Sequence, residues 1–343
     1  MPAPRDPVAD LKRIAYLLEA MQEPAFRIRA FRGAAAALVE MGPDEVARLA
    51  ATGGLRGVSG IGEVTERTIL ESLRGEEPVY LRRLESAEGQ PLEEGAAALR
   101  QALRGDLHAH TLASDGGATI RDMAETAIEL GHEYLVITDH SPRLTVANGL
   151  STERLMAQLD EIAVLNAGLA PFRILTGIEV DINEDGSLDQ TTEVLDRLDV
   201  VVGSVHSELR MPERPMTRRM VAALADPNLD VLGHCTGRMK AGRRNRPPST
   251  FDAEIVFAAA ARFDKAIEVN SRPERLDPPK RLLRLAVEAG CRVSIDSDAH
   301  TPGQLSWLRN GCERAFLCGV TTEMVVNALA ADDLLAWTGS HSA

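Results

Sequence analysis

The chain has 343 residues, a length that suggests about two domains. Hydrophobic residues make up 44% and charged residues 26%, as in ordinary globular proteins, while aromatic residues make up only 3%. The net charge of −13 argues against a broad basic surface that coats nucleic acid, although it is compatible with a local basic patch.

The residue pattern gives no reason to expect a membrane-spanning or a secreted protein. No apolar run reaches the roughly 18–20 residues needed to cross a membrane, and the first residues, Met-Pro-Ala-Pro-Arg-Asp, lack the apolar stretch of a secretory signal. The four cysteines form no Cys-x-x-Cys pair, so no disulfide framework is expected. We therefore expect no membrane partner and a location in the reducing cytoplasm.

Three amphipathic helices are predicted at residues 8–22, 25–41 and 44–51. They are followed by a Gly-Ile-Gly turn between two short helical patterns, the arrangement of a helix-hairpin-helix motif. Gly57, Gly60 and Gly62 allow close approach of the backbone, and N–H groups at the next helix start could hold a DNA phosphate. The same glycines also suit a tight helix–helix turn that binds nothing.

Residues 8–86 resemble the N-terminal helical domain of family X DNA polymerases. The matching pieces are the run from Pro24 to Ala35 and the hairpin from Gly57 to Ile69. The resemblance implies an N-terminal domain, residues 1–86, that can bind DNA. Some members of that family carry a lyase lysine on the helix after the hairpin, but Glu-Arg-Thr stands there in this chain, so we expect no lyase activity.

Residues 87–104 contain glycine, proline and a run of alanines, and we interpret them as a linker. This segment is too short to hold a polymerase palm with its catalytic aspartates. DNA synthesis is therefore not expected of this chain.

From residue 105 onward, strand-like and helical patterns alternate. Repeated strand–helix units predict a parallel sheet, and seven units in about 230 residues favour an incomplete barrel over an open sheet. In parallel barrels the chemistry lies at the carboxyl ends of the strands. The pattern assigns no role to residues 321–343. The predicted strands are 106–111, 133–140, 173–180, 200–206, 229–234, 266–270 and 292–298, and helices include 120–130, 152–167, 253–262 and 279–289.

Histidines and acidic residues gather at these strand ends. His108 and His110 are two residues apart, so on a strand both side chains can point at one ion. Six of the eight histidines of the chain fall at such ends. A single buried histidine is usually a satisfied core residue, but six that converge with acids between them predict a site for Zn²⁺, Mn²⁺ or Fe²⁺.

Residues 105 to about 320 resemble the PHP domain, in the version found at the C-terminus of bacterial family X polymerases. The runs 230–238 and 268–277 carry the likeness. The implied fold class is α/β, a distorted (β/α)7 PHP barrel over residues 105–335 preceded by a small all-α helix-hairpin-helix domain. One departure is Cys235, where the family usually has proline; its thiol is either an extra ligand or a small packed residue.

The resemblance also implies a ligand set for three divalent metal ions. The first ion would be held by His108, His110, Glu179 and Asp298, the second by Glu179, His206 and His234, and the third by Asp115, His140 and His300. A bridging carboxylate at Glu179 would hold two ions roughly 3.5–4 Å apart, as in two-metal phosphoester hydrolysis. The attacking hydroxide would be activated by the metal, so no separate catalytic residue is expected.

Four aspartates flank these ligands in the sequence. They would either accept imidazole N–H groups and orient the ligands, or be ordinary residues at strand ends. They are Asp106, Asp139, Asp181 and Asp296.

Candidate substrate-binding residues are Arg238, Lys240 and Arg243, in the basic segment 238–246, together with Asn270 and Arg272. The segment could clamp a phosphate or a nucleic-acid backbone, or it could be a solvated loop. The expected activity is hydrolysis of phosphate esters at DNA 3′ ends, as a 3′–5′ exonuclease or a 3′-phosphatase. The alternatives are a small-molecule phosphatase of the histidinol phosphatase type and a non-catalytic DNA-binding protein, which an intact ligand set disfavours.

Overall fold

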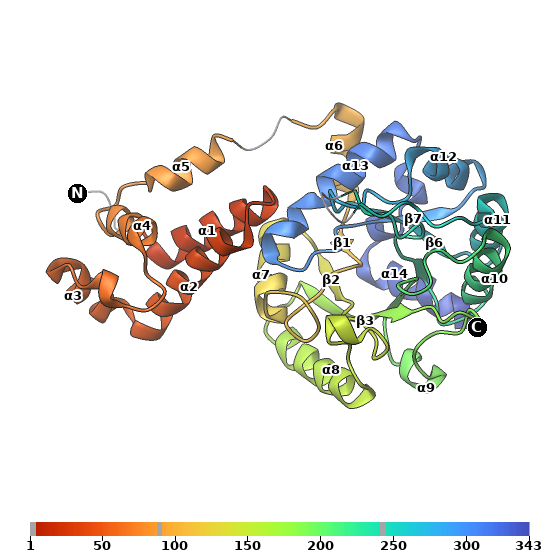
Figure 1. Cartoon of the computed structure of the whole chain (residues 1–343), viewed down its shortest axis with the longest axis horizontal. Helices are drawn as coiled ribbons and strands as arrows, with labels where there is room; N and C mark the ends of the chain where they lie inside the picture. The colour runs from red at the N-terminus through yellow and green to blue at the C-terminus, as the bar shows by residue number, and fades with distance from the viewer. Residues whose placement is uncertain (1–4, 88–90, 241–244, 343) are drawn as a thin grey trace. The chain divides into compact units, whose positions relative to one another are not determined.

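The computed structural model describes residues 5–87, 91–240 and 245–342, and the chain divides into two compact units, Met1–Pro91 and Leu92–Ala343. The first unit is helical and has an apolar core made by its own residues, among them Leu11, Ile14, Phe31 and Leu38. This confirms the expected all-α N-terminal region. Its elements are α1 (Pro7–Ala20), α2 (Ala25–Met41), α3 (Pro43–Thr52), η1 (Leu55–Gly57), α4 (Glu63–Leu73) and α5 (Val79–Glu85) (Figure 1).

The described part of the second unit contains a seven-stranded sheet whose neighbouring strands are all parallel and follow the order of the chain. The expected α/β barrel of seven strands is thereby confirmed. Runs such as Tyr-Leu-Val-Ile in the second strand are buried at every position, as in parallel sheets covered on both faces. The strands are β1 (Gly105–Asp106), β2 (Tyr134–Ile137), β3 (Arg173–Asp181), β4 (Val200–Ser204), β5 (Val231–Leu232), β6 (Ala266–Asn270) and β7 (Arg292–Asp296).

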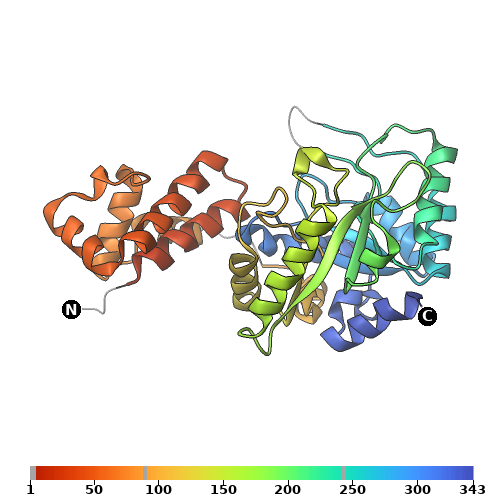
Figure 2. The ribbon, with the colours of Figure 1, turned by 90° about the horizontal axis from the view of Figure 1, so that it is seen from below.

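Helices surround this sheet in both views (Figures 1 and 2). Several begin with side-chain caps; the hydroxyl of Thr119, for example, accepts the N–H of Asp122 at 3.1 Å at the start of α7. The helices of the unit are α6 (Glu94–Ala102), α7 (Ile120–Glu129), α8 (Thr152–Asn166), α9 (Thr192–Leu195), α10 (Glu213–Leu224), α11 (Ala253–Arg262), α12 (Lys280–Glu288), α13 (Leu308–Leu317) and α14 (Ala331–Gly339). Among the described residues, no helix is both long and apolar enough to cross a bilayer.

The linker predicted at residues 87–104 is shorter than expected. The second unit begins at Leu92, and α6 belongs to it. Ala96, Leu99 and Leu103 recur at intervals of three and four residues and are buried, and the two leucines pack with Leu308 and Cys312 of α13. The alanine-rich stretch is therefore an amphipathic helix of the barrel unit.

The barrel closes between β1 and β7 through side chains. β1 ends at Asp106, earlier than predicted, and beyond it Ala109 and Ala299 form an isolated parallel bridge. Asp296 Oδ1 accepts the N–H of Leu107 at 3.0 Å, and Asp106 Oδ1 accepts the N–H of Ser297 at 3.2 Å. Carboxylates thus accept backbone N–H groups that a continuous ladder would have paired.

Asn327 completes this junction from the C-terminal segment. Its amide Nδ2 donates to the carbonyls of Gly105 at 3.0 Å and Ile295 at 2.7 Å, and its Oδ1 accepts the N–H of Ile295 at 3.0 Å. The side chain is fully buried. The segment to which the sequence assigned no role therefore fastens the first strand to the last.

The C-terminal segment also covers the amino ends of the strands (dark blue in Figure 2). Leu334 and Trp337 of α14 share an apolar cluster with Tyr134 and Val200, which are the first residues of β2 and β4. The hydroxyl of Tyr134 donates to the carbonyl of Leu329 at 3.2 Å. The carboxyl ends at the opposite side of the barrel remain for the site.

We predict that Asn327→Ala lowers the free energy of unfolding of the barrel unit by about 3 kcal/mol, because three buried backbone groups lose their partner. Both tryptophans of the chain, Trp307 and Trp337, lie in this unit, so fluorescence during urea denaturation reports on it alone. Asn245→Ala at an exposed position is the control and should leave the midpoint unchanged. An unchanged midpoint in Asn327→Ala would show that the junction does not depend on this amide.

Candidate metal centre

Glu179 of β3 lies at the centre of the carboxyl end of the barrel and is 1% exposed. Both of its oxygens face imidazole nitrogens that come from other strand ends. Burial alone would raise the pKa of Glu179, yet the surrounding imidazoles, His206 foremost, hold it well below its ordinary value. Oε1 lies 2.8 Å from His234 Nε2 and 3.3 Å from His206 Nε2, and Oε2 lies 2.8 Å from His140 Nδ1, 3.4 Å from His108 Nε2 and 3.6 Å from His110 Nε2.

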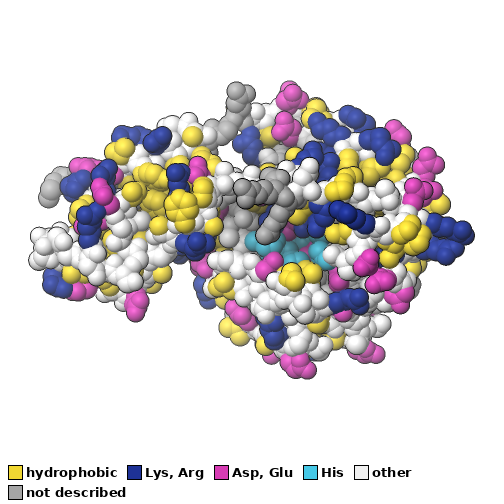
Figure 3. Space-filling model, in the orientation of Figure 1, with side chains coloured by type: hydrophobic (Ala, Val, Ile, Leu, Met, Phe, Trp, Pro, Cys, Tyr) yellow, Lys and Arg dark blue, Asp and Glu magenta, His cyan; other side chains and the backbone are white. Residues whose placement is uncertain are grey.

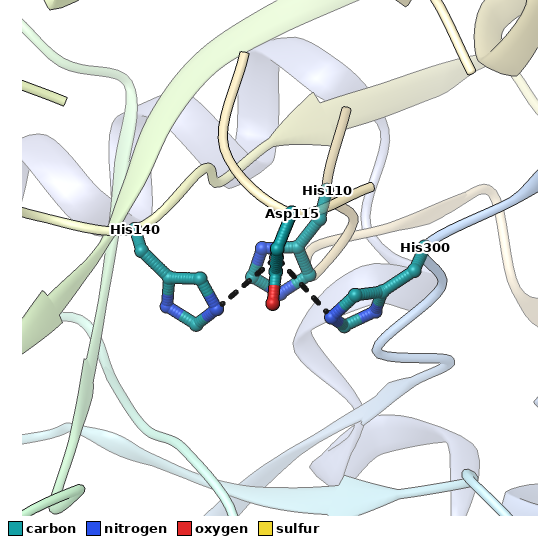
Figure 4. Close-up of side chains that lie close together, drawn as sticks. All are labelled: His110, Asp115, His140 and His300. Carbon is teal, nitrogen blue, oxygen red and sulfur yellow. Dashed lines mark ion pairs between the residues drawn. The ribbon is translucent and has the colours of Figure 1, made fainter. Parts of the chain in front are cut away.

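A second group of side chains adjoins this centre (Figure 4). Asp115 Oδ1 lies 3.5 Å from His140 Nε2 and 3.5 Å from His300 Nε2, which approach it from opposite sides. His110 lies between them, and one ligand atom from each of the four residues falls within 4.8 Å of the others. On the face seen in Figure 3, histidine side chains reach the surface in one recess.

The unmet nitrogens of these histidines fit a metal site. His108 Nε2, His206 Nε2 and both ring nitrogens of His110 are buried and have no hydrogen-bond partner. Buried polar atoms in folded proteins are normally paired, and imidazole and carboxylate donors converging at this spacing suit divalent ions such as Zn²⁺, Mn²⁺ or Fe²⁺. The residues present therefore fit divalent metal ions.

The structure brings all nine predicted ligands together. Asp298 also belongs to the centre, since its Oδ1 lies 3.5 Å from the Nε2 of His110. The grouping is less exclusive than the one implied by the resemblance, since His110 and His140 each belong to two clusters. The clusters with mutually close ligand atoms are His110, Asp115, His140 and His300; His108, His110 and Glu179; and His140, Glu179 and His206.

Two carboxylates orient the histidines from behind. Glu268 Oε1 lies 2.6 Å from His108 Nδ1, and Asp181 Oδ1 lies 2.9 Å from His206 Nδ1. Each carboxylate favours a proton on Nδ1, which turns the lone pair of Nε2 towards Glu179. Burial by itself would lower the pKa of His108, but Glu268 and Glu179 raise it well above its ordinary value.

Of the four flanking aspartates, Asp181 is thus the one that accepts from an imidazole. Asp106 and Asp296 bond backbone N–H groups across the β1–β7 junction. Asp139 accepts from the hydroxyl of Thr111 at 2.6 Å and from Gln158 Nε2 at 2.6 Å, and so fixes the loop that leads to Asp115. At His108 the residue that accepts the imidazole N–H is Glu268 and not one of the other three aspartates. The sequence analysis did not assign this role to Glu268. The available signal was its position on β6, two residues before Asn270.

The candidate substrate residues divide into different roles. Arg238 is buried, and its guanidinium donates to the carbonyls of Arg275, at 2.9 Å, and Leu276. It therefore supports the loop after β6, and the expectation that it clamps a substrate is corrected. Lys240 is exposed, and its part in substrate binding stays a prediction, while Arg243 lies outside the described residues.

Asn270 and Arg272 do lie at the centre. Asn270 Nδ2 donates to Asp298 Oδ2 at 3.1 Å and to Glu268 Oε2 at 3.2 Å, so it separates two buried carboxylates. Arg272 Nη1 lies 3.2 Å from His300 Nδ1. A further arginine that the sequence analysis missed, Arg275, places its Nε 3.0 Å from Asp298 Oδ2.

Cys235 is a packed residue. Its Sγ lies 3.7 Å from Asp277 Oδ1, and it belongs to none of the clusters of potential metal ligands among the described residues. Burial raises the pKa of the thiol well above its ordinary value, which disfavours the thiolate that a metal would require.

The glycines of the predicted helix-hairpin-helix motif lie from the last residue of η1 to the residue before α4, and the motif itself stays a prediction. Gly60 has φ +90°, which favours glycine. The N–H of Gly57 donates to the carbonyl of Gly54 at 3.0 Å, and that of Gly62 donates to Thr65 Oγ1 at 2.9 Å. These N–H groups are therefore used within the hairpin, and phosphate binding at the three glycines stays a prediction.

Comparison with known proteins agrees with this architecture. A model of the PHP domain matches residues 106–272, a span that includes seven of the nine clustered residues. The DNA polymerase/3′-5′ exonuclease PolX of Bacillus subtilis is 40% identical over 235 residues, which are 68% of this chain and 41% of that protein. The chain therefore spans about two fifths of the length of that relative.

Shorter relatives are covered more fully. Probable phosphatases of Citrobacter koseri and Acetivibrio thermocellus are each 30% identical, over 57% of this chain and 78% of their own length. The structure of histidinol phosphate phosphatase from Lactococcus lactis, complexed with zinc, L-histidinol and phosphate, is 17% identical, with a TM-score of 0.47 over 64% of this chain and 94% of that chain. The family model matches the chain from β1 to β6, and the chain covers 78% of two relatives that are 30% identical to it. The chain therefore belongs to the PHP-domain family.

Proposed function

We propose that this protein is a metal-dependent phosphoesterase with three divalent ions, and that it acts on the 3′ end of DNA as a 3′–5′ exonuclease or a 3′-phosphatase. The observation that carries the proposal is the buried carboxylate of Glu179, surrounded by five imidazoles with unmet nitrogens on a PHP-family barrel. The nine residues at the carboxyl ends of the strands would hold Zn²⁺, Mn²⁺ or Fe²⁺. When bound, these ions supply a lowered pKa for water and positive charge for a phosphoryl group.

The side chains divide this work by position. Glu179 offers its two oxygens to opposite sides of the centre, which suits a carboxylate shared between ions. Glu268 and Asp181 hold His108 and His206 in the tautomer whose Nε2 can donate a lone pair. Among the nine clustered residues Asp115 has the most exposed side chain, with 36% accessible. A phosphate ester would therefore enter the site from the side where Asp115, His140 and His300 lie.

The N-terminal unit favours DNA as the substrate. It has a separate core and carries the hairpin, so it can hold a nucleic acid without contributing to the chemistry. The Bacillus subtilis relative is named as both a polymerase and a 3′-5′ exonuclease. The second candidate, a small phosphomonoester, is favoured by the relatives named as probable phosphatases, of which this chain covers 78%.

We predict that Glu179→Gln removes bound metal and hydrolysis of p-nitrophenyl phosphate together, because a neutral amide loses the charge shared between the ions. The expected fall in kcat/KM is at least about 100-fold, which corresponds to ~2.7 kcal/mol of transition-state stabilisation. Elemental analysis of the purified protein measures the metal. Glu184→Gln, at an exposed position three residues after the end of β3, should keep both properties. Full activity of Glu179→Gln would exclude the metal site described above.

We predict that a chain starting at Leu92 hydrolyses p-nitrophenyl phosphate at the rate of the full chain but needs a higher concentration of a 3′-labelled oligonucleotide. The physical reason is that the barrel keeps its own core and centre while the DNA-holding unit is lost. Steady-state kinetics on both substrates at low salt measure the difference. An equal loss on both substrates would mean that the first unit supports the barrel fold. No loss on the oligonucleotide would favour the small phosphomonoester.

A further inference from the structure

Arg275 lies on the loop between β6 and α12 and points its guanidinium at the centre. Its side chain is 13% exposed, and Nε forms an ion pair with Asp298 Oδ2 at 3.0 Å. This contact is an ion pair without hydrogen-bond geometry, so Nε is buried without a hydrogen-bond acceptor, and so is Nη1. A buried donor without a partner is energetically unfavourable, and more so when it is charged. The Nε and Nη1 groups of Arg275 can therefore donate to a bound anion without losing an existing hydrogen bond.

The loop holds Arg275 in place through its backbone. The buried Arg238 donates from Nε to the carbonyl of Arg275 at 2.9 Å and from Nη2 to that of Leu276. The N–H of Arg275 donates to the carbonyl of Arg272 at 2.9 Å, and the N–H of Asn270 donates to that of Asp277 at 2.8 Å. The guanidinium is thus positioned before any ligand arrives, which lowers the entropy cost of binding.

Two other arginines lie nearby. Arg238 supports the loop through two backbone carbonyls. Arg272 also has a buried Nε without a hydrogen-bond partner, but its Nη1 already lies 3.2 Å from His300 Nδ1, whereas both Nε and Nη1 of Arg275 are unpartnered. We propose that Arg275 binds the non-bridging oxygens of the phosphate ester, and that it rather than Arg238 is the arginine clamp of the site. A planar guanidinium matches two such oxygens with parallel N–H donors. This inference rests on the proposed function and names the group that recognises its phosphate.

The test measures binding of inorganic phosphate to the metal-loaded full chain by calorimetry, with metal content determined on the same samples. Arg275→Met should weaken phosphate binding at least about tenfold, because hydrogen bonds to charged groups are lost. Arg275→Lys should retain metal but recover only part of the affinity, since an ammonium cannot supply two parallel donors. Arg210→Met, at an exposed position on the loop after β4, is the matched control and should bind phosphate as the wild type does.

Two results would overturn the proposal. One is an unchanged phosphate affinity in Arg275→Met with full metal content. The other is full recovery of both metal and phosphate binding in Arg275→Lys, which would mean that the residue serves only to neutralise Asp298. If the wild type binds phosphate but hydrolyses no ester, the proposed function fails, while the binding comparison among the variants still decides the role of Arg275.

Discussion

A carboxylate that is almost completely removed from water is stable only where positive charge or hydrogen-bond donors compensate for its lost hydration. Glu179 is in this situation, and the arrangement of the barrel mouth follows from it. Five imidazoles surround the carboxylate, and they reach it because parallel strands place their carboxyl ends side by side. The fold thus supplies both the buried charge and the ring of nitrogens that can share it with metal ions.

Charges of alternating sign surround this centre in successive layers. Behind His108 stands Glu268, and beside Asp298 stands Arg275, which Arg238 supports through the backbone of its loop. The imidazole of His108 and the carboxylate of Asp298 are therefore each held by a side chain of opposite charge. Such contacts fix the direction of these two side chains before a ligand binds, which is what a preorganised site requires.

The strands could be predicted from the sequence because alternating strand and helix patterns are local. Histidines at strand ends indicated a metal centre, while the full set of nine residues was implied by the resemblance to the PHP domain. The residues that were missed act across long separations: Glu268 meets His108 over 160 residues, and Asn327 meets Gly105 over 222. Arg238 was assigned to the substrate because its charge is visible in the sequence, whereas the carbonyls that occupy its guanidinium are not. α6 was missed because Gly89, Pro91 and Gly95 were taken as marks of a linker, although the alanines that follow them favour a helix.

The hydrogen bonds that Asn327 makes across the β1–β7 junction have a consequence for the order in which the barrel forms during synthesis. Gly105 of β1, three residues before His108, leaves the ribosome more than two hundred residues ahead of the Asn327 amide that bonds it. Until β7 and the segment after it emerge, β1 has only β2 as a neighbouring strand, and His108 and His110 face a barrel mouth that lacks Asp298 and His300. Long-range closure of this kind makes folding slow. The nascent barrel therefore acquires its complete set of ligands late, when nearly all of its chain is already present.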